Sequence, residues 1–171
     1  MGRTMENTTN LLRAWTVRTE RGNAKTLMDK ILAGNDLTNT HVLVVRADMI
    51  FGMDHLRTAL YHAERAIEEG TNSSDSLAME TLLYASAERQ LSTAIRKMSV
   101  SDRTEEIVVA QLAGGRLEPD ETWRELDDTT DLTVDRLLRF GVTKTELSTI
   151  GGRSPLDLVL ERVAAVDILK K

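Results

Sequence analysis

The sequence predicts an α+β fold, a single domain over residues 1–171 in which a small, mostly antiparallel sheet packs against several helices. Two observations lead to this prediction. Short apolar runs rich in β-branched residues occur between longer segments whose apolar residues recur every three to four positions. The chain of 171 residues, with 41% hydrophobic content, is also long enough to bury one core and needs no second domain.

The first part of the chain contains four expected elements in the order strand, helix, strand, helix. They cover residues 11–19, Asn23–Ala33, His41–Arg46 and Met53–Glu69. The run HVLVVR at residues 41–46 is β-branched and bounded by turn residues, which is typical of a central strand. Gly34 and Gly70 follow the two helical patterns directly, and glycine is the residue most common just after a helix end.

The longest helical pattern runs from Ser76 to Met98, and we expect one continuous helix there. At about 100° per residue its apolar side chains gather on one broad arc, which predicts a face toward the core. Arg89 and Arg96 fall on a second line among small residues, where an anion has room to bind. The alternative is an ordinary core helix with solvated arginines. Either Asp75 or Ser74 is expected to cap its start.

The last part of the chain contains one more strand and three helices. We expect them at Ile107–Leu112, Leu132–Phe140, Thr143–Ile150 and from Ser154 to the C-terminus. Thr143 and Glu146 have the spacing of a capping box, and Pro155 follows a serine N-cap. Between the strand and these helices, an acidic segment without clear periodicity is expected to be held to the core by Trp123 and Leu126.

The final helix is apolar on two sides. One side is expected to face the core, through Leu156, Val159, Leu160, Val163 and Val166. The roughly opposite side carries Leu158, Ala165, Ile168 and Leu169. A helix of this kind is either fully buried or covered by a partner, and for a terminal helix of a one-sheet domain we favour a partner.

Composition limits the classes of function. The net charge of −5 argues against nucleic acid, but residues 101–131 hold ten acidic and three basic residues, so the remainder of the chain has a charge of +2. The absence of cysteine excludes disulfides, thiolate zinc sites and a cysteine nucleophile. No apolar run approaches the roughly 20 residues of a membrane span, and no signal peptide is evident. We therefore expect a soluble, cytoplasmic protein without a membrane partner.

The residues that could carry chemistry favour binding over catalysis. His55 and His62 share one line of their helix, but a rise of 1.5 Å per residue separates them by about 10 Å, too far to ligate one metal. Glu88 beside Arg89 is more typical of a surface ion pair than of a catalytic acid. The chain has no nucleotide-binding glycine loop and no nucleophile elbow. We therefore predict no catalytic residue, no metal site and no cofactor.

Two stretches carry a family resemblance. The run LLYASAERQLSTAIRKM, preceded by ADMIFGMDHLRTALYHAERAIEEG, resembles the TPRKB-like (Cgi-type) family, the non-catalytic subunit of the KEOPS complex, in an archaeal form. Similarity extends from about Leu12 to the C-terminus and is densest from Val42 to Val100. KEOPS makes the threonylcarbamoyl modification on the adenosine next to the anticodon of certain tRNAs. The chain departs from the family at Ala87, where members usually have glycine.

The resemblance implies two binding surfaces. One binds tRNA, including its single-stranded CCA end, through Glu88, Arg89, Gln90, Arg96 and Lys97. Arg89, Arg96 and Lys97 would neutralise phosphates, and Gln90 or Glu88 would bond a base edge or sugar hydroxyl. Because Gln90 projects toward the core margin, a structural role for it is equally open.

The second implied surface binds the kinase-like ATPase subunit of KEOPS through the final helix. Its expected contact residues are Leu158, Ala165, Val166, Ile168 and Leu169. Other KEOPS subunits would be contacted only indirectly. The alternative function is a protein-only adaptor that regulates a kinase-like partner without touching RNA, which the acidic net charge favours. A small enzyme is a third possibility, but no pocket of converging titratable groups can be named for it.

Overall fold

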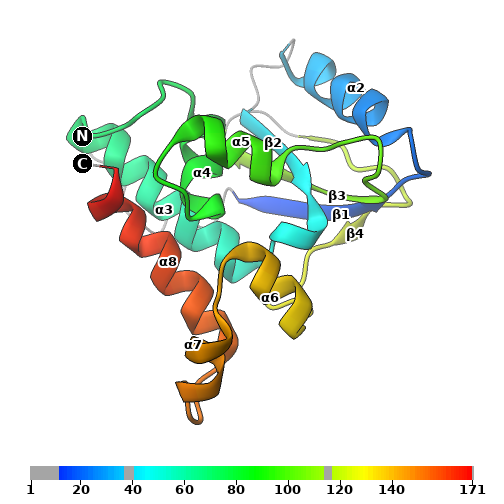
Figure 1. Cartoon of the computed structure of the whole chain (residues 1–171). Helices are drawn as coiled ribbons and strands as arrows, with labels where there is room; N and C mark the ends of the chain where they lie inside the picture. The colour runs from blue at the N-terminus through cyan, green and yellow to red at the C-terminus, as the bar shows by residue number, and fades with distance from the viewer. Residues whose placement is uncertain (1–11, 37–40, 114–116, 171) are drawn as a thin grey trace.

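The computed structural model describes residues 12–36, 41–113 and 117–170. These residues form one α+β domain, in which a four-stranded antiparallel sheet of order β2-β3-β1-β4 is flanked by helices (Figure 1). The elements in chain order are β1 (Arg13–Arg18), α2 (Ala24–Asp36), β2 (His41–Arg46), the 3-10 turn η1 (Ala47–Met49), α3 (Met53–Glu69), α4 (Leu77–Ser86), α5 (Leu91–Met98), β3 (Glu106–Ala113), β4 (Arg124–Glu125), α6 (Val134–Phe140), α7 (Lys144–Thr149) and α8 (Pro155–Leu169). The predicted fold class is confirmed.

The two faces of the sheet bury two separate apolar clusters, because successive side chains of a strand point to opposite faces. Ala14, Val45 and Ala110 belong to the larger cluster, which also contains the buried faces of α3, α4 and α8. Trp15 and Val109 belong to the smaller one, which α2 covers. Figure 1 shows this arrangement, with α2 on one side of the sheet and the other long helices on the opposite side.

The predicted helix from Ser76 to Met98 is wrong, because the chain forms two helices there. α4 ends at Ser86 and α5 begins at Leu91 (Figure 1). Ala87 lies between them with φ 60° and ψ 25°, the left-handed conformation that ends many helices, and its N–H donates to the carbonyl of Tyr84 over 3.0 Å. Arg89 and Arg96 therefore do not lie together on one face of a single helix, as the prediction had placed them.

α4 is buried on nearly all sides, which the prediction of a single apolar arc missed. Glu80 is fully buried in it, with Oε1 accepting from Lys170 at 2.7 Å and Oε2 accepting from the N–H groups of Ser73 and Ser74, each at 3.0 Å. A buried carboxylate is tolerated only when its charge and lone pairs are satisfied, as they are here. The helix is capped by Ser76, not by the expected Asp75 or Ser74.

The acidic segment folds back over the start of α3. The N–H groups of Met53 and Asp54 donate to the carbonyls of Asp127 and Asp128 at 2.8 and 3.2 Å, which satisfies donors that a helix start leaves unpaired. Gly52 makes this approach possible, since its φ is 113° and a Cβ there would overlap the carbonyl oxygen of Asp128. The segment also forms the two-residue strand β4, which was not predicted.

Several further sequence-based expectations for this part of the chain are confirmed. Trp123 packs on Trp15 with ring centroids 5.8 Å apart, and Leu126 is buried. The capping box of Thr143 and Glu146 is present, and α8 starts with a serine N-cap and proline as predicted. Among the described residues, no helix combines the length and apolar character needed to cross a membrane.

Candidate functional site

The resemblance directs attention to the loop of residues 87–90 between α4 and α5. Arg89 and Gln90 are exposed there, whereas the side chain of Glu88 retains 31% of its surface. Gln90 precedes α5 as its N-cap and makes no side-chain capping bond. It therefore lies at the surface and not at the core margin where the helical projection placed it.

The end of α4 beneath this loop is fixed by side chains from other elements. His55 is completely buried on α3, where its Nδ1 accepts from the N–H of Phe51 at 3.1 Å and its Nε2 lies 2.8 Å from the carbonyl of Ala85. These partners require a neutral imidazole protonated on Nε2. Burial lowers the pKa of His55 to about 4, which agrees with the neutral form.

Lys97 fixes the loop from the other side. Its ammonium donates to the carbonyls of Ser86 and Phe140, lies 3.2 Å from Glu88 and stands 4.0 Å from the centre of the Phe140 ring. The side chain is only 14% exposed. Burial lowers the pKa of Lys97, against the opposing effect of Glu88. These contacts occupy the ammonium, so Lys97 holds the 87–90 loop against α6 and does not offer a free charge.

Arg89 and Arg96 differ from Lys97 in having their guanidinium groups available. Both residues are exposed, one in the loop and the other on α5. Neither side chain forms a hydrogen bond or an ion pair with any residue that the structure describes. The five residues assigned to RNA from sequence thus divide into two free cations, the exposed Gln90, and the Glu88–Lys97 pair.

Two arginines on the outward face of α3 are paired. Arg57 bonds Asp54 and Asp128, each at 2.9 Å, and Arg65 pairs with Glu69 at 3.3 Å. They behave as members of a solvated helix face.

The final helix offers a smaller outward surface than predicted. Leu158 and Val166 are core residues, 7% and 0% exposed, so the prediction that Leu158 faces outward is wrong and neither residue is accessible to a partner. Ala165 is half-buried. Ile168 and Leu169 are 75% and 49% exposed, which is unusual for large apolar side chains.

α8 is attached to the fold near these exposed residues by a polar cluster. The carboxylate of Asp167 accepts from the hydroxyl of Tyr84 on α4 and lies 2.9 Å from Nδ1 of His62 on α3. Burial alone would raise the pKa of Asp167, but these bonds outweigh it and the pKa is lowered. His62 is thus a structural residue, and its partner could not be found from sequence because 105 positions separate the two.

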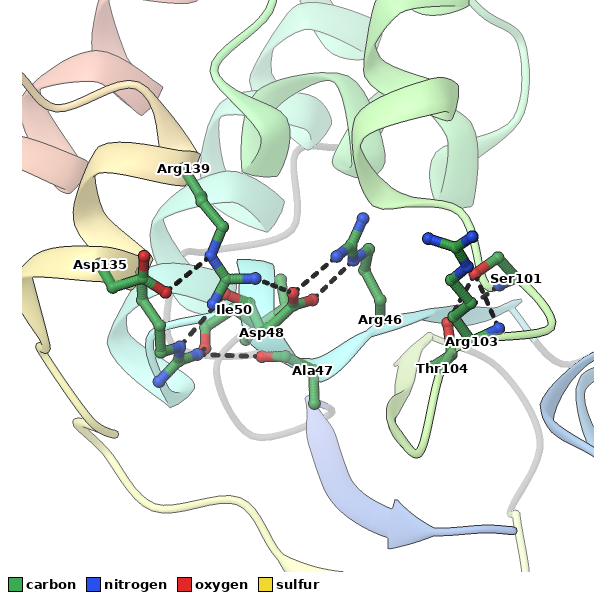
Figure 2. A network of polar contacts seen from close by, with 10 residues as sticks. Arg46, Ala47, Asp48, Ile50, Ser101, Arg103, Thr104, Asp135 and Arg139 are labelled. Atoms are coloured by element: carbon green, nitrogen blue, oxygen red, sulfur yellow. Dashed lines mark hydrogen bonds and ion pairs between the residues drawn. The ribbon is translucent and has the colours of Figure 1, made fainter. Parts of the chain in front are cut away.

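Sequence reasoning also missed a cluster of arginines around Asp48, the central residue of η1. Arg46 forms two bonds to the carboxylate, at 2.6 and 2.7 Å, and Arg139 from α6 donates a third at 2.8 Å (Figure 2). Partial burial raises the pKa of Asp48, but the bonds and charges of Arg46 and Arg139 exceed that effect and lower it. The only sequence signal was the charge of these residues, and Arg139 lies 91 positions from Asp48.

A hollow of about 1260 Å³ lies beside this cluster, between the sheet and residues 122–132. Its charged lining residues are Arg18, Asp48, Glu106, Arg124, Glu125, Asp127, Asp131 and Arg136. Carboxylates outnumber guanidinium groups there, which disfavours a phosphate ligand. Within the described part of the chain, no three acidic or histidine side chains are placed to hold a metal ion.

Comparison with known proteins identifies the family. Residues 20–148 match the family model for kinase binding protein CGI-121. The chain belongs to this family. The match covers the sheet except β1 and includes α3 to α6, whereas α8 lies beyond it. No curated protein matches the chain. Membership in a kinase-binding family agrees with a role in binding a partner protein.

Proposed function

We propose that this CGI-121 protein is the non-catalytic subunit of a KEOPS complex, where it binds the kinase-like ATPase and recruits tRNA, including its 3′ CCA end. In this role the protein makes or breaks no bond. The modification, threonylcarbamoylation of the adenosine next to the anticodon, would be carried out by the other subunits. Family membership supports the kinase partner, and the resemblance supplies the complex and the tRNA.

One observation carries the RNA part of the proposal: Arg89 and Arg96 are exposed and without a partner among the described residues. Arginine side chains that bind no carboxylate of their own protein can neutralise phosphates at little cost in lost internal bonds. The exposed Gln90, next to Arg89, can bond a base edge or a ribose hydroxyl of an unpaired nucleotide. Glu88 and Lys97 are assigned a supporting role, because they hold the loop that presents these groups.

The test is tRNA binding by Arg89→Glu and Arg96→Glu variants, measured with full-length tRNA and with tRNA lacking its CCA end. We expect each substitution to weaken binding of full-length tRNA by about tenfold or more and to reduce the preference over the truncated tRNA. Arg124→Glu is the control, since Arg124 is exposed on β4, at the opposite edge of the sheet from β2, the strand against which α4 packs. Unchanged affinity in both loop variants would remove the RNA site.

The second candidate function is a protein-only adaptor, which the net charge of −5 favours. A salt titration separates the two functions, because each phosphate contact steepens the dependence of log affinity on log salt. A wild-type protein that binds no tRNA at low salt, yet binds the kinase-like ATPase, would establish the adaptor.

A further inference from the structure

Asp48 holds two guanidinium groups in fixed positions at the surface. Arg46 uses Nε and one terminal nitrogen for Asp48, and Arg139 uses NH1 for Asp48 and Nε for Asp135. The other terminal nitrogen of each arginine has no partner among the described residues. The two side chains are 35% and 45% exposed, so these remaining donors can reach a ligand in solvent.

The support beneath the two arginines is rigid. Arg136 is half-buried and donates to the carbonyls of Ala47 and Ile50, at 3.0 and 2.8 Å, and to the carbonyl of Asp48 at 3.2 Å. Three carbonyls of the turn are thus held by one side chain from α6, which fixes the backbone that carries Asp48. Guanidinium groups fixed in this way lose less freedom on binding than free surface arginines.

We propose that Arg46 and Arg139, oriented by Asp48, bind phosphates of the RNA backbone as a site additional to Arg89 and Arg96. The proposal rests on the proposed tRNA-binding function. The free terminal nitrogen of each guanidinium can donate a charge-assisted hydrogen bond to a phosphate oxygen, so the pair can contact one phosphate or two neighbouring ones. The arrangement is open, which fits a polymer better than a small anion that needs an enclosure.

The course of the chain extends this surface in one direction. Arg46 ends β2 and pairs with Ile107 of β3. The loop that carries Arg103 directly precedes β3. The guanidinium of Arg103 has no partner among the described residues. Figure 2 shows Arg139, Arg46 and Arg103 in this order from left to right, from α6, the end of β2 and the loop before β3. Spaced positive charges along an open surface are suited to consecutive phosphates.

The first test uses the variants Arg46→Gln, Arg139→Gln and their combination, with tRNA binding measured over a range of salt concentrations. We expect the double variant to bind about tenfold more weakly and its slope of log affinity against log salt to fall by about one for each arginine removed. Full-length and CCA-truncated tRNA should be affected equally, because the backbone contacts lie outside the single-stranded end. Arg124→Gln serves as the matched control, because Arg124 is exposed on β4, at the opposite edge of the sheet from β2.

The second test asks what Asp48 does. If Asp48 only neutralises the arginines, Asp48→Asn removes a negative charge and raises tRNA affinity. The proposal predicts the opposite, a several-fold loss, because both guanidinium groups are released from their fixed positions. Asp135→Asn is the control, since this carboxylate is 81% exposed and bonds Arg139 alone, and it should cause no loss. Increased affinity of Asp48→Asn would overturn the positioning role.

Failure of this inference can be told from failure of the proposed function. If wild-type protein binds no tRNA, the proposed function fails. If wild-type binding depends on Arg89 and Arg96 but the Arg46 and Arg139 variants bind as tightly as wild type, only the second site fails. If these variants keep tRNA but lose the kinase-like ATPase, the cluster faces a protein, and the phosphate site is overturned. Thermal unfolding of Arg139→Gln, a surface change, checks that the fold is intact.

Discussion

At the scale of single residues, the buried His55 makes the stability of the protein depend on pH. Its imidazole is fully buried and neutral, with burial lowering its pKa from 6.5 to about 4. Between these two values the unfolded chain binds a proton that the folded chain does not, so stability falls as pH drops through this range and is fully present above about pH 6.5. The loss between pH 7 and pH 4 is about 3 kcal/mol by the conversion of 1.36 kcal/mol per pKa unit.

We therefore expect urea unfolding to show a lower free energy at pH 5 than at pH 7, and His55→Gln to reduce that difference. The control is His41→Gln, because His41 is exposed on β2. Equal pH dependence in wild type and in His55→Gln would contradict the assignment. The readout is the change with pH, so a lower absolute stability of the variant does not obscure it.

At this scale sequence reasoning distinguished some residues and not others. Arg89 and Arg96 were placed outside the core, and they are exposed. Lys97 was expected to be free for RNA as well, but two backbone carbonyls and the carboxylate of Glu88 hold its ammonium. A lysine at a solvated position and one that crosslinks two backbone carbonyls look identical in a sequence, because the carbonyls belong to elements 11 and 43 positions away.

At the scale of elements, the break between α4 and α5 depends on Ala87. An L-residue in the left-handed region costs roughly 1–2 kcal/mol, whereas glycine adopts it freely. The glycine that the resemblance implies at this position would adopt the turn without strain, whereas Ala87 strains the chain there.

We expect Ala87→Gly to stabilise the protein by about 0.5–1 kcal/mol in urea unfolding, after allowance for the greater freedom of glycine in the unfolded chain. Gly70→Ala is the matched reverse change. Gly70 ends α3 at φ 74°, with open space around its Cα, and its replacement should destabilise the protein by about 1 kcal/mol. Destabilisation by Ala87→Gly would show that the left-handed turn is not the conformation in solution.

The break could not be predicted, for two physical reasons. Alanine has the highest helix propensity of all residues, so nothing in the local sequence marks the end of α4. Residues 87–90 also span about one helical turn, which leaves the apolar period nearly in phase across the gap. β1 was predicted from its alternating apolar residues, and β2 and β3 from their β-branched runs, whereas β4 has only two residues and is held by its pairing with β1.

At the scale of the whole molecule, the two proposed interactions use different elements. RNA is assigned to the 87–90 loop, α5 and the Asp48 cluster, and the kinase-like ATPase to the exposed end of α8. Tyr61 and Ile67, on α3 beside α8, are also 37% exposed each. Apolar surface on two packed helices is typical of a protein contact.

We expect Ile168→Asp to weaken binding of the kinase-like ATPase by tenfold or more, because a charge would be buried against the partner. Val134→Asp is the control, as Val134 is 57% exposed on α6 and outside this surface. Isothermal titration with the purified ATPase measures both variants, and tRNA binding by Ile168→Asp should match that of wild type. Wild-type affinity of Ile168→Asp would remove the end of α8 from the partner surface.

The amino-acid sequence by itself determined the fold class, most of the helices and strands, and the family, because periodicity, capping residues and family motifs are local signals. Only the tertiary structure decided which charges are available. Lys97 and Asp167 are occupied by distant partners, Leu158 is buried, and Arg46 meets Arg139 across Asp48. Burial and pairing depend on contacts between residues far apart in the chain, and no local pattern records those contacts.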